Sequence, residues 1–162
     1  MKNSTLCYIE QDGKYLMLHR VKKENDCNKD KWIGVGGKFE DGESPEECMI
    51  REVREETGLL VNSWNYRGIV TFVSDAWETE YMHLFTCNDF SGTLIDSRDC
   101  SEGNLEWVEI SKVSSLPLWE GDKIFLELLT KDIGFFSLKL QYKGEKLVCA
   151  CLDGKMVRSE KE

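Results

Sequence analysis

Three glutamates at a fixed spacing suggest a site that binds a metal ion. Glu52, Glu55 and Glu56 occupy relative positions 0, 3 and 4, and residues three and four apart lie on the same face of a helix. At about 5.5 Å, each pair of like charges costs roughly 3 kcal/mol at an effective dielectric constant near 20. A bound cation would relieve this repulsion. Because carboxylates are hard oxygen ligands, the pattern favours Mg²⁺, with Mn²⁺ as the alternative.

The flanking residues predict the helix that would carry these carboxylates. Ser44 can cap its N-terminus, Glu47 completes a capping box, and Pro45 falls at the first helical position. Gly58 stands where a left-handed residue is wanted after the last turn. We therefore expect a helix over residues 45–57 with an apolar stripe beside the charges. For the charged segment alone, an ordinary solvated helix is the simpler alternative.

The complete segment resembles the motif of a known family. Residues 37–59 read GKFEDGESPEECMIREVREETGL and match every position of the Nudix box, G-x5-E-x7-R-E-U-x-E-E-x-G-U with U aliphatic. The resemblance implies an α/β fold, an α/β/α sandwich around a mixed sheet, and Mg²⁺-dependent hydrolysis of nucleoside diphosphates linked to another group. It also implies that the Gly37 carbonyl binds metal together with the three glutamates, and that Glu52 is the candidate to activate water. Glu43 and Arg51 are expected to hold the loop against the helix.

Other positions are similar to those of one group in this family, the MutT-type 8-oxo-dGTP diphosphatases. Glu102, five residues ahead of Trp107, falls where those enzymes place a further metal-binding glutamate. Arg20 matches a basic residue that contacts phosphate, and Lys38 follows the glycines in a GGK sequence that recurs in the group. The simpler alternative is that these three side chains are ordinary surface charges.

The same resemblance implies a pocket for a nucleobase. Thr5, Trp119 and Asp122 look like parts of it, with Trp119 stacking on the base and Asp122 accepting hydrogen bonds from a purine edge. Trp119 could instead be an anchor of the core. Two departures from the group bear on base selection. Ile33 replaces an Asn in the pattern W-N-G-F-G-G-K and cannot hydrogen-bond, and the paired acids after the Trp are reduced to Gly121 and Asp122.

The rest of the chain reads mainly as strands joined by turns. Asp12-Gly13 and Gly144 mark two hairpins, the second near the C-terminus. Residues 122–130 predict a second amphipathic helix, and residues 153–162 a frayed tail. The length of 162 residues predicts a single domain with a substantial core.

Composition argues against several classes of partner. The net charge is −9 and the sequence pI is about 4.9, so no basic face for duplex nucleic acid is expected. A bound metal can still attract phosphate. No apolar run is long enough to span a bilayer, and the first residues show no signal-peptide pattern. We expect a cytoplasmic protein, and the seven scattered cysteines fit reduced thiols.

The leading hypothesis is Mg²⁺-dependent hydrolysis of a nucleoside triphosphate, with a purine or oxidised purine base, to monophosphate and pyrophosphate. The expected partner is thus a small nucleotide. One alternative substrate class is ADP-ribose, a dinucleotide polyphosphate or the triphosphate end of RNA, although the Pro typical of the ADP-ribose group is missing between Pro45 and Pro117. The other alternative is a non-catalytic nucleotide-binding module, although such modules often lose box carboxylates and this chain keeps them.

Overall fold

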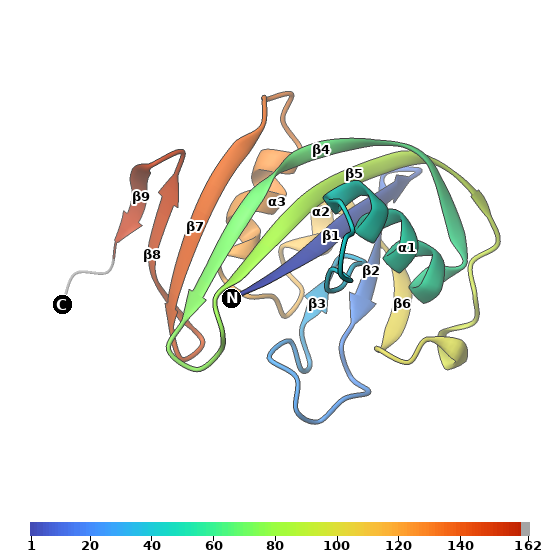
Figure 1. The fold of residues 1–162 in the computed structure, drawn as a ribbon, viewed down its shortest axis with the longest axis horizontal. Coiled ribbons are helices and arrows are strands. Elements are labelled where there is room, and N and C mark those ends of the chain that lie inside the picture. The colour runs from blue at the N-terminus through green and yellow to red at the C-terminus, as the bar shows by residue number, and fades with distance from the viewer. Residues whose placement is uncertain (160–162) are drawn as a thin grey trace.

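The computed structural model describes residues 1–159 as a nine-stranded sheet with helices on both of its faces (Figure 1). The strands are β1 (Lys2–Gln11), β2 (Lys14–His19), β3 (Trp32–Ile33), β4 (Leu59–Ser74), β5 (Glu80–Gly92), β6 (Asn104–Glu109), β7 (Phe136–Lys143), β8 (Lys146–Leu152) and β9 (Lys155–Ser159). The helices are α1 (Pro45–Thr57), α2 (Ile110–Val113) and α3 (Asp122–Leu129), with a 3-10 turn η1 (Ser97–Asp99).

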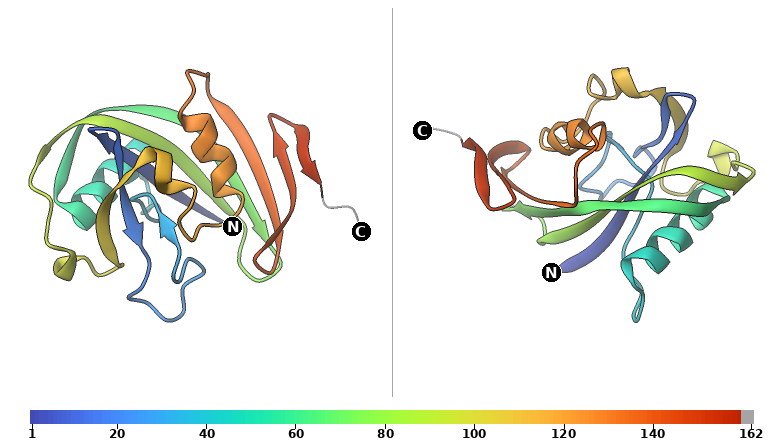
Figure 2. Two further views of the ribbon diagram at one scale, coloured as in Figure 1. Left: turned by 180° about the vertical axis from the view of Figure 1, so that it is seen from behind. Right: turned by 90° about the horizontal axis from the view of Figure 1, so that it is seen from above.

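The sheet is mixed in strand direction. Its neighbours follow the order β3-β2-β1-β5-β4-β7-β8-β9, and β6 pairs with β2. β1 is parallel to β5 and β4 is parallel to β7, whereas the other pairs are antiparallel. Figure 2 shows α1 and α3 on opposite faces of the sheet. The α/β/α sandwich around a mixed sheet is therefore confirmed.

Strand β1 lies directly beside the glycine segment that precedes α1. Residues 4–9 of β1 are buried, as expected for a central strand covered on both faces. Isolated bridges join β1 to residues 35–38. Gly36 must lack a side chain, because a Cβ there would lie 1.8 Å from the Thr5 carbonyl oxygen. This close approach places the segment before α1 against β1.

Helix α1 begins and ends where the sequence predicts. The Ser44 hydroxyl accepts a hydrogen bond from the Glu47 N–H at 3.1 Å, and the Glu47 carboxylate accepts one from the Ser44 N–H at 3.0 Å. Gly58 follows the last turn with φ of 79°, and its N–H donates to the Arg54 carbonyl at 2.9 Å. These caps are local, so tertiary context was not needed to locate the helix.

The hydrophobic core lies between the central strands and the two longer helices. Met49 and Val53 of α1 are buried over one face of the sheet, and Phe125 and Leu129 of α3 are buried over the other. All seven cysteines are free thiols. Within residues 1–159, none of the helices has both the length and the apolar character needed to cross a bilayer.

The C-terminal segment corrects one prediction. A frayed tail was expected over residues 153–162, but residues 155–159 form β9, which runs antiparallel to β8. Asp153 and Gly154 make the tight turn with φ of 50° and 84°, the left-handed conformation that Asp-Gly pairs adopt in hairpins. All of β9 is exposed, which suits a charged edge strand. The predicted hairpin of β7 and β8 is confirmed, and residues 160–162 lie outside the described residues.

Candidate active site

The three glutamates of α1 lie in unequal environments. Glu56 is buried, and the side chain of Glu52 is 15% exposed, whereas that of Glu55 is 54% exposed. Glu52 and Glu56 line a cavity in the structure. Glu55 instead pairs with Arg51 at the surface, 3.1 Å from its Nη1. The helix therefore brings two of the three predicted carboxylates into the cavity wall.

Arg51 donates hydrogen bonds to three glutamates and to the loop before the helix, and its Nε lies 3.6 Å from a fourth glutamate, Glu40. Its Nε and Nη2 donate to the two oxygens of Glu43 at 2.7 and 2.8 Å, and Nη2 also donates to the Lys38 carbonyl at 3.0 Å. These bonds hold the pKa of Glu43 at about 2. Nη1 donates to Glu52 at 2.7 Å and to Glu55. Through Glu43 and the Lys38 carbonyl, Arg51 thus ties the loop before α1 to the helix.

Glu56 carries a carboxylate oxygen without a hydrogen-bond partner among the described residues. This oxygen, Oε2, is buried. Burial, followed by the charges of Glu52 and Glu102, raises the Glu56 pKa to about 8, whereas Arg20 and the Gly36 N–H act in the opposite direction. Leaving a buried polar atom unpaired costs about 1–3 kcal/mol. A cation next to Glu56 would remove this cost.

Glu52 and Glu102 complete the acidic end of the cavity. Burial raises the pKa of Glu52, the hydrogen bond from Arg51 opposes that shift, and the charge of Glu102 adds to it. Glu102, in the loop between η1 and β6, pairs with Lys23 at 2.9 Å. Because the charge of Glu102 raises the pKa of both Glu52 and Glu56, the three carboxylates occupy one neighbourhood although they come from two separate parts of the chain.

Gly37 lies against this neighbourhood through its backbone. A Cβ at this position would be 2.4 Å from the carboxylate carbon of Glu52, so any other residue here would push that carboxylate from its present position. The Gly37 carbonyl accepts a hydrogen bond from the Thr5 N–H at 2.9 Å. It also accepts a longer bond from the Cys48 thiol at 3.6 Å. Because a carbonyl oxygen has two lone pairs, a metal ion that binds here would have to displace that thiol.

The donors at the acidic end fit a divalent cation. They are all oxygen atoms, the ligands that Mg²⁺ takes, and one of them is the unpartnered buried oxygen of Glu56. Within residues 1–159, no three acidic, histidine or cysteine side chains already converge in metal-binding geometry. Instead, Arg51 holds Glu52 and Lys23 holds Glu102 in ion pairs. Binding of a cation would therefore require these two carboxylates to turn from their ion pairs.

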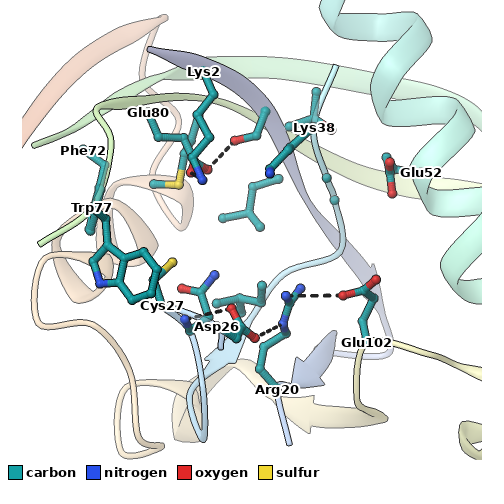
Figure 3. Close-up of a pocket in the computed structure, with 18 of the residues that line it drawn as sticks. Lys2, Arg20, Asp26, Cys27, Lys38, Glu52, Phe72, Trp77, Glu80 and Glu102 are labelled. Carbon is teal, nitrogen blue, oxygen red and sulfur yellow. Dashed lines mark hydrogen bonds and ion pairs between the residues drawn. The ribbon is translucent and has the colours of Figure 1, made fainter. Parts of the chain in front are cut away.

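A cavity of about 540 Å³ connects the acidic end with a largely apolar end. In Figure 3, Glu52 and Glu102 lie on one side of this cavity and Phe72 and Trp77 on the other. The volume falls within the range of small-molecule sites. Most of the residues predicted for separate roles, from metal ligands to base contacts, therefore line one continuous space.

Two predicted phosphate contacts lie between these ends. Arg20 Nε donates to Asp26 at 2.8 Å, and Arg20 Nη2 lies 3.3 Å from Glu102. Lys38 is exposed and also lines the cavity, near Lys2 in the close-up (Figure 3). Positive charge is thus present between the acidic and apolar ends, with Arg20 already held by carboxylates.

Trp119 is buried in the core and also lines the apolar end of the cavity. Its ring packs edge-on against Phe72 and Tyr142, with centroids 5.3 and 4.8 Å apart. Its Nε1 donates to the Asn28 side-chain oxygen at 2.9 Å, and Lys31 Nζ lies 4.6 Å from the ring centroid. The alternative of a core anchor is therefore confirmed, and stacking on a base stays a prediction.

The same cavity is lined by the other two residues predicted to contact the base, and by Ile33, the residue that replaces an Asn of the MutT-type pattern. Asp122 is 5% exposed, and burial raises its pKa to about 8 against the opposing charge of Lys31. Thr5 is buried with its hydroxyl 3.5 Å from the Cys48 sulfur. Ile33 adds an apolar surface. The apolar end thus contains a buried carboxyl group whose pKa is raised far above the ordinary value for an aspartate.

Sequence reasoning missed several residues of the cavity wall. Trp77, in the connection between β4 and β5, is 38% exposed and lines the cavity. Glu80 accepts a hydrogen bond from the Ser4 hydroxyl at 2.7 Å and lies 3.3 Å from Lys2 Nζ. Asp26 belongs to a polar loop that looks featureless in sequence. Trp77, an aromatic residue in a short connection between strands, was the one residue that the sequence could have signalled. The contacts of Glu80 with Ser4 and Lys2 join segments far apart in the chain.

Comparisons with known proteins agree with the fold and the motif. The family model of the NUDIX domain matches residues 2–129. An uncharacterized Nudix hydrolase of Bacillus subtilis, YvcI, is 29% identical over 149 residues, covering 90% of this chain and 89% of its own. The oxidized purine nucleoside triphosphate hydrolase of Danio rerio is 29% identical over 140 residues, covering 83% and 85%. A crystal structure of a MutT protein from Bacillus halodurans superposes with a TM-score of 0.83 at 25% identity, covering 96% and 99%.

Proposed function

The chain belongs to the Nudix family and is a hydrolase of pyrophosphate bonds, and on this basis we propose that it cleaves a nucleoside triphosphate to monophosphate and pyrophosphate. The proposed base is a purine or an oxidised purine, and the proposed cofactor is Mg²⁺. Water attacks one of the two phosphorus atoms that flank the α–β bridging oxygen, and the bond from that phosphorus to the bridging oxygen breaks. A carboxylate of the protein takes up the proton of the water.

One observation carries this proposal. The cavity has an acidic end that fits a divalent ion and an apolar end with a buried carboxyl group and an indole ring, and cationic side chains lie between them. A nucleoside triphosphate has the complementary order of groups, with metal-binding phosphates at one end and a planar base with polar edges at the other. A substrate without a base would leave the apolar end unused.

At the acidic end, Glu52, Glu56 and Glu102, with the Gly37 carbonyl, would hold the ion. Glu55, the other carboxylate of the motif, would have to turn from its surface pair with Arg51 to join them. Such an ion neutralises phosphate oxygens and lowers the pKa of a bound water. Glu52 is the proposed group that accepts the proton from water. Its place in the cavity wall, against Gly37 and beside Glu56, supports this role, because a general base must lie within reach of the water.

Between the ends, Arg20 and Lys38 would bind the phosphates. Arg20 is held by Asp26 and Glu102 in the structure, and a phosphate could replace either carboxylate with its own oxygens. Arginine presents a planar set of donors that matches phosphate. Lys38, being exposed, would contribute mainly through its charge and would be screened by salt.

At the apolar end, Asp122 would bind the base together with Trp119 and Thr5. Its pKa of about 8 favours a neutral carboxyl that donates a hydrogen bond, instead of the acceptor role that the sequence suggested. Purines offer acceptors for such a donor, for example N7 and O6 of guanine. The similarity to the Danio rerio hydrolase of oxidized purine nucleoside triphosphates supports the purine. Ile33 adds contact area without a hydrogen bond.

The test is a panel of substrates with Mg²⁺ and a readout that separates pyrophosphate from orthophosphate. We expect purine nucleoside triphosphates, including 8-oxo-dGTP, to give monophosphate and pyrophosphate with higher kcat/KM than pyrimidine triphosphates or ADP-ribose. Glu52→Gln should remove this activity. Glu106→Gln is the matched control, because Glu106 is exposed on β6 away from the cavity.

Three results would contradict the proposal. The first is faster cleavage of ADP-ribose than of any nucleoside triphosphate. The second is release of orthophosphate in place of pyrophosphate. The third is tight nucleotide binding without turnover in Mg²⁺, which would identify a non-catalytic nucleotide-binding module.

A further inference from the structure

Strands β7 to β9 lie beyond the residues that match the NUDIX model, which ends at residue 129. They form one edge of the sheet, next to α3 (Figure 1). They contribute no residue to the wall of the cavity. Nevertheless, they contact several segments that do line its apolar end. The role of this extension therefore rests on the contacts that it makes behind the wall.

Tyr142 of β7 makes the most buried of these contacts. Its hydroxyl oxygen accepts a hydrogen bond from the Gly121 N–H at 2.7 Å. Its ring packs against Trp119 and Phe72, with centroids 4.8 and 5.2 Å away. Both of these aromatic residues line the cavity, as does Asp122, the residue after Gly121. Tyr142 therefore lies directly behind the wall that the proposed base would touch.

Gly121 shows how closely β7 packs here. A Cβ at this position would lie 2.6 Å from the Tyr142 hydroxyl oxygen and 2.6 Å from a methyl group of Leu140. The φ of Gly121 is −69°, so the reason for glycine is space and not backbone conformation. In this chain Gly121 stands where the MutT-type pattern has the first of its paired acids, and a side chain there would have to displace Tyr142 or Leu140. The space for the first acid is filled by β7.

The turns of the extension reach two more segments of the wall. In the β7–β8 turn, Glu145 pairs with Lys31, whose Nζ lies over the Trp119 ring. The next contact is the Gly144 N–H, which donates to Asp75 at 2.9 Å. Asp75 stands two residues before Trp77. Trp77 lines the cavity on the side opposite Glu52, as Figure 3 shows. The turn thus restrains two different sides of the apolar end.

We propose that β7 and the β7–β8 turn position the base-binding end of the cavity, and that Tyr142 is a positioning residue for Trp119 and Asp122. This inference rests on the proposed function, since it assigns a base to that end. Through the bond to Gly121, Tyr142 orients the turn that begins α3, and with it the Asp122 carboxyl. The extension would thereby determine which base binds without touching the base.

The experiment compares Tyr142→Phe with Tyr66→Phe. The control removes a hydroxyl that bonds to His83 on a residue outside the cavity wall. For Tyr142→Phe, we expect KM for the preferred nucleoside triphosphate to rise about tenfold with kcat changed less than twofold, because a buried N–H loses its acceptor. Preference among bases should weaken. Tyr66→Phe should leave both parameters unchanged.

Two further measurements keep the test decisive. Hydrogen exchange at residues 120–123 should be at least about tenfold faster in Tyr142→Phe and unchanged in Tyr66→Phe. Glu145→Lys alters an exposed side chain and should fold normally, and by repelling Lys31 it should raise KM about threefold. Unchanged exchange together with unchanged KM in Tyr142→Phe overturns the inference, as does an equal loss of kcat in Tyr142→Phe and Tyr66→Phe.

A failure of the positioning role of Tyr142 can be distinguished from a failure of the proposed substrate. If the wild-type protein cleaves a different pyrophosphate compound, the proposed substrate is wrong, and KM is then measured with that compound. A rise in KM and faster exchange would still support the positioning role of Tyr142. If the compound has no base and KM does not change, the positioning of a base is overturned as well.

Discussion

The two ends of the cavity are built in different ways. At the acidic end, Glu52, Glu56 and the arginine that holds Glu52 come from a single helix of 13 residues, and only Glu102 is added from a distant loop. At the apolar end, Trp119 is held by Asn28 from one loop, Phe72 from β4 and Tyr142 from β7. The comparison shows that one cavity can combine an end defined by local spacing with an end defined by long-range packing.

The ends also differ in how charge is managed. Several carboxylates share the acidic end, and cationic partners or a metal must offset their repulsion. The apolar end has a single buried acid, Asp122, which burial keeps protonated. Substitutions at the first end should therefore change catalysis and metal binding, whereas substitutions at the second should change affinity for the base.

The largest expected effect is at the acidic end. Glu56→Gln should lower kcat by about 100- to 1,000-fold, the typical loss of one electrostatic group at a reacting centre. Without Mg²⁺ the thermal midpoint should be unchanged or higher, because the amide resembles the protonated carboxyl. Added Mg²⁺ should raise the midpoint of the wild type but not of the variant. An equal rise in both would contradict the metal role of Glu56.

The next largest effect is a pH dependence of KM that comes from Asp122 at the apolar end. Asp122 loses its proton as pH rises through about 8, so KM of the wild type should rise about tenfold from pH 7 to pH 9. Asp122→Asn keeps a donor, and its KM should not depend on pH. The folded-state pKa lies above the ordinary 3.8, so stability from this group is present below pH 3.8 and lost as pH rises through about 8. A wild-type KM that is flat over this range would refute the donor role.

A smaller effect tests the support of the acidic end. Glu43→Gln should reduce the free energy of unfolding by about 1 kcal/mol in urea titrations at pH 7, through loss of the bidentate pair with Arg51. Because the folded-state pKa of Glu43 is lowered to about 2, its stabilisation is present above pH 4.5 and lost as pH falls toward 2. The variant and the wild type should converge at low pH, and a constant difference would argue against the ion pair.

The smallest effect lies between the two ends. Lys38→Gln should raise KM about threefold at low salt, and the difference should shrink as salt is added, because the charge is exposed and screened. Lys139→Gln, an exposed substitution on β7, is the control. A salt-independent difference would indicate a direct buried contact in place of a screened charge.

Much of the fold was predictable where its signals were local. The caps of α1 and the Asp12-Gly13 hairpin depend on neighbouring residues, and both were located correctly. The turn at Asp153 and Gly154 carries the same signal as the first hairpin but was passed over, because the charged segment after it resembles a solvated tail. That segment is an exposed edge strand, for which charge is usual.

The motif was sufficient to identify the carboxylates of α1 and the chemistry that they suit, because helical spacing places side chains on one face whatever the remainder of the chain does. Only the tertiary structure showed that Glu56 is buried with an unpartnered oxygen, that burial raises the pKa of Asp122, and that Tyr142 lies behind Trp119. These properties depend on desolvation and on contacts between segments far apart in the chain, and neither is encoded in local spacing.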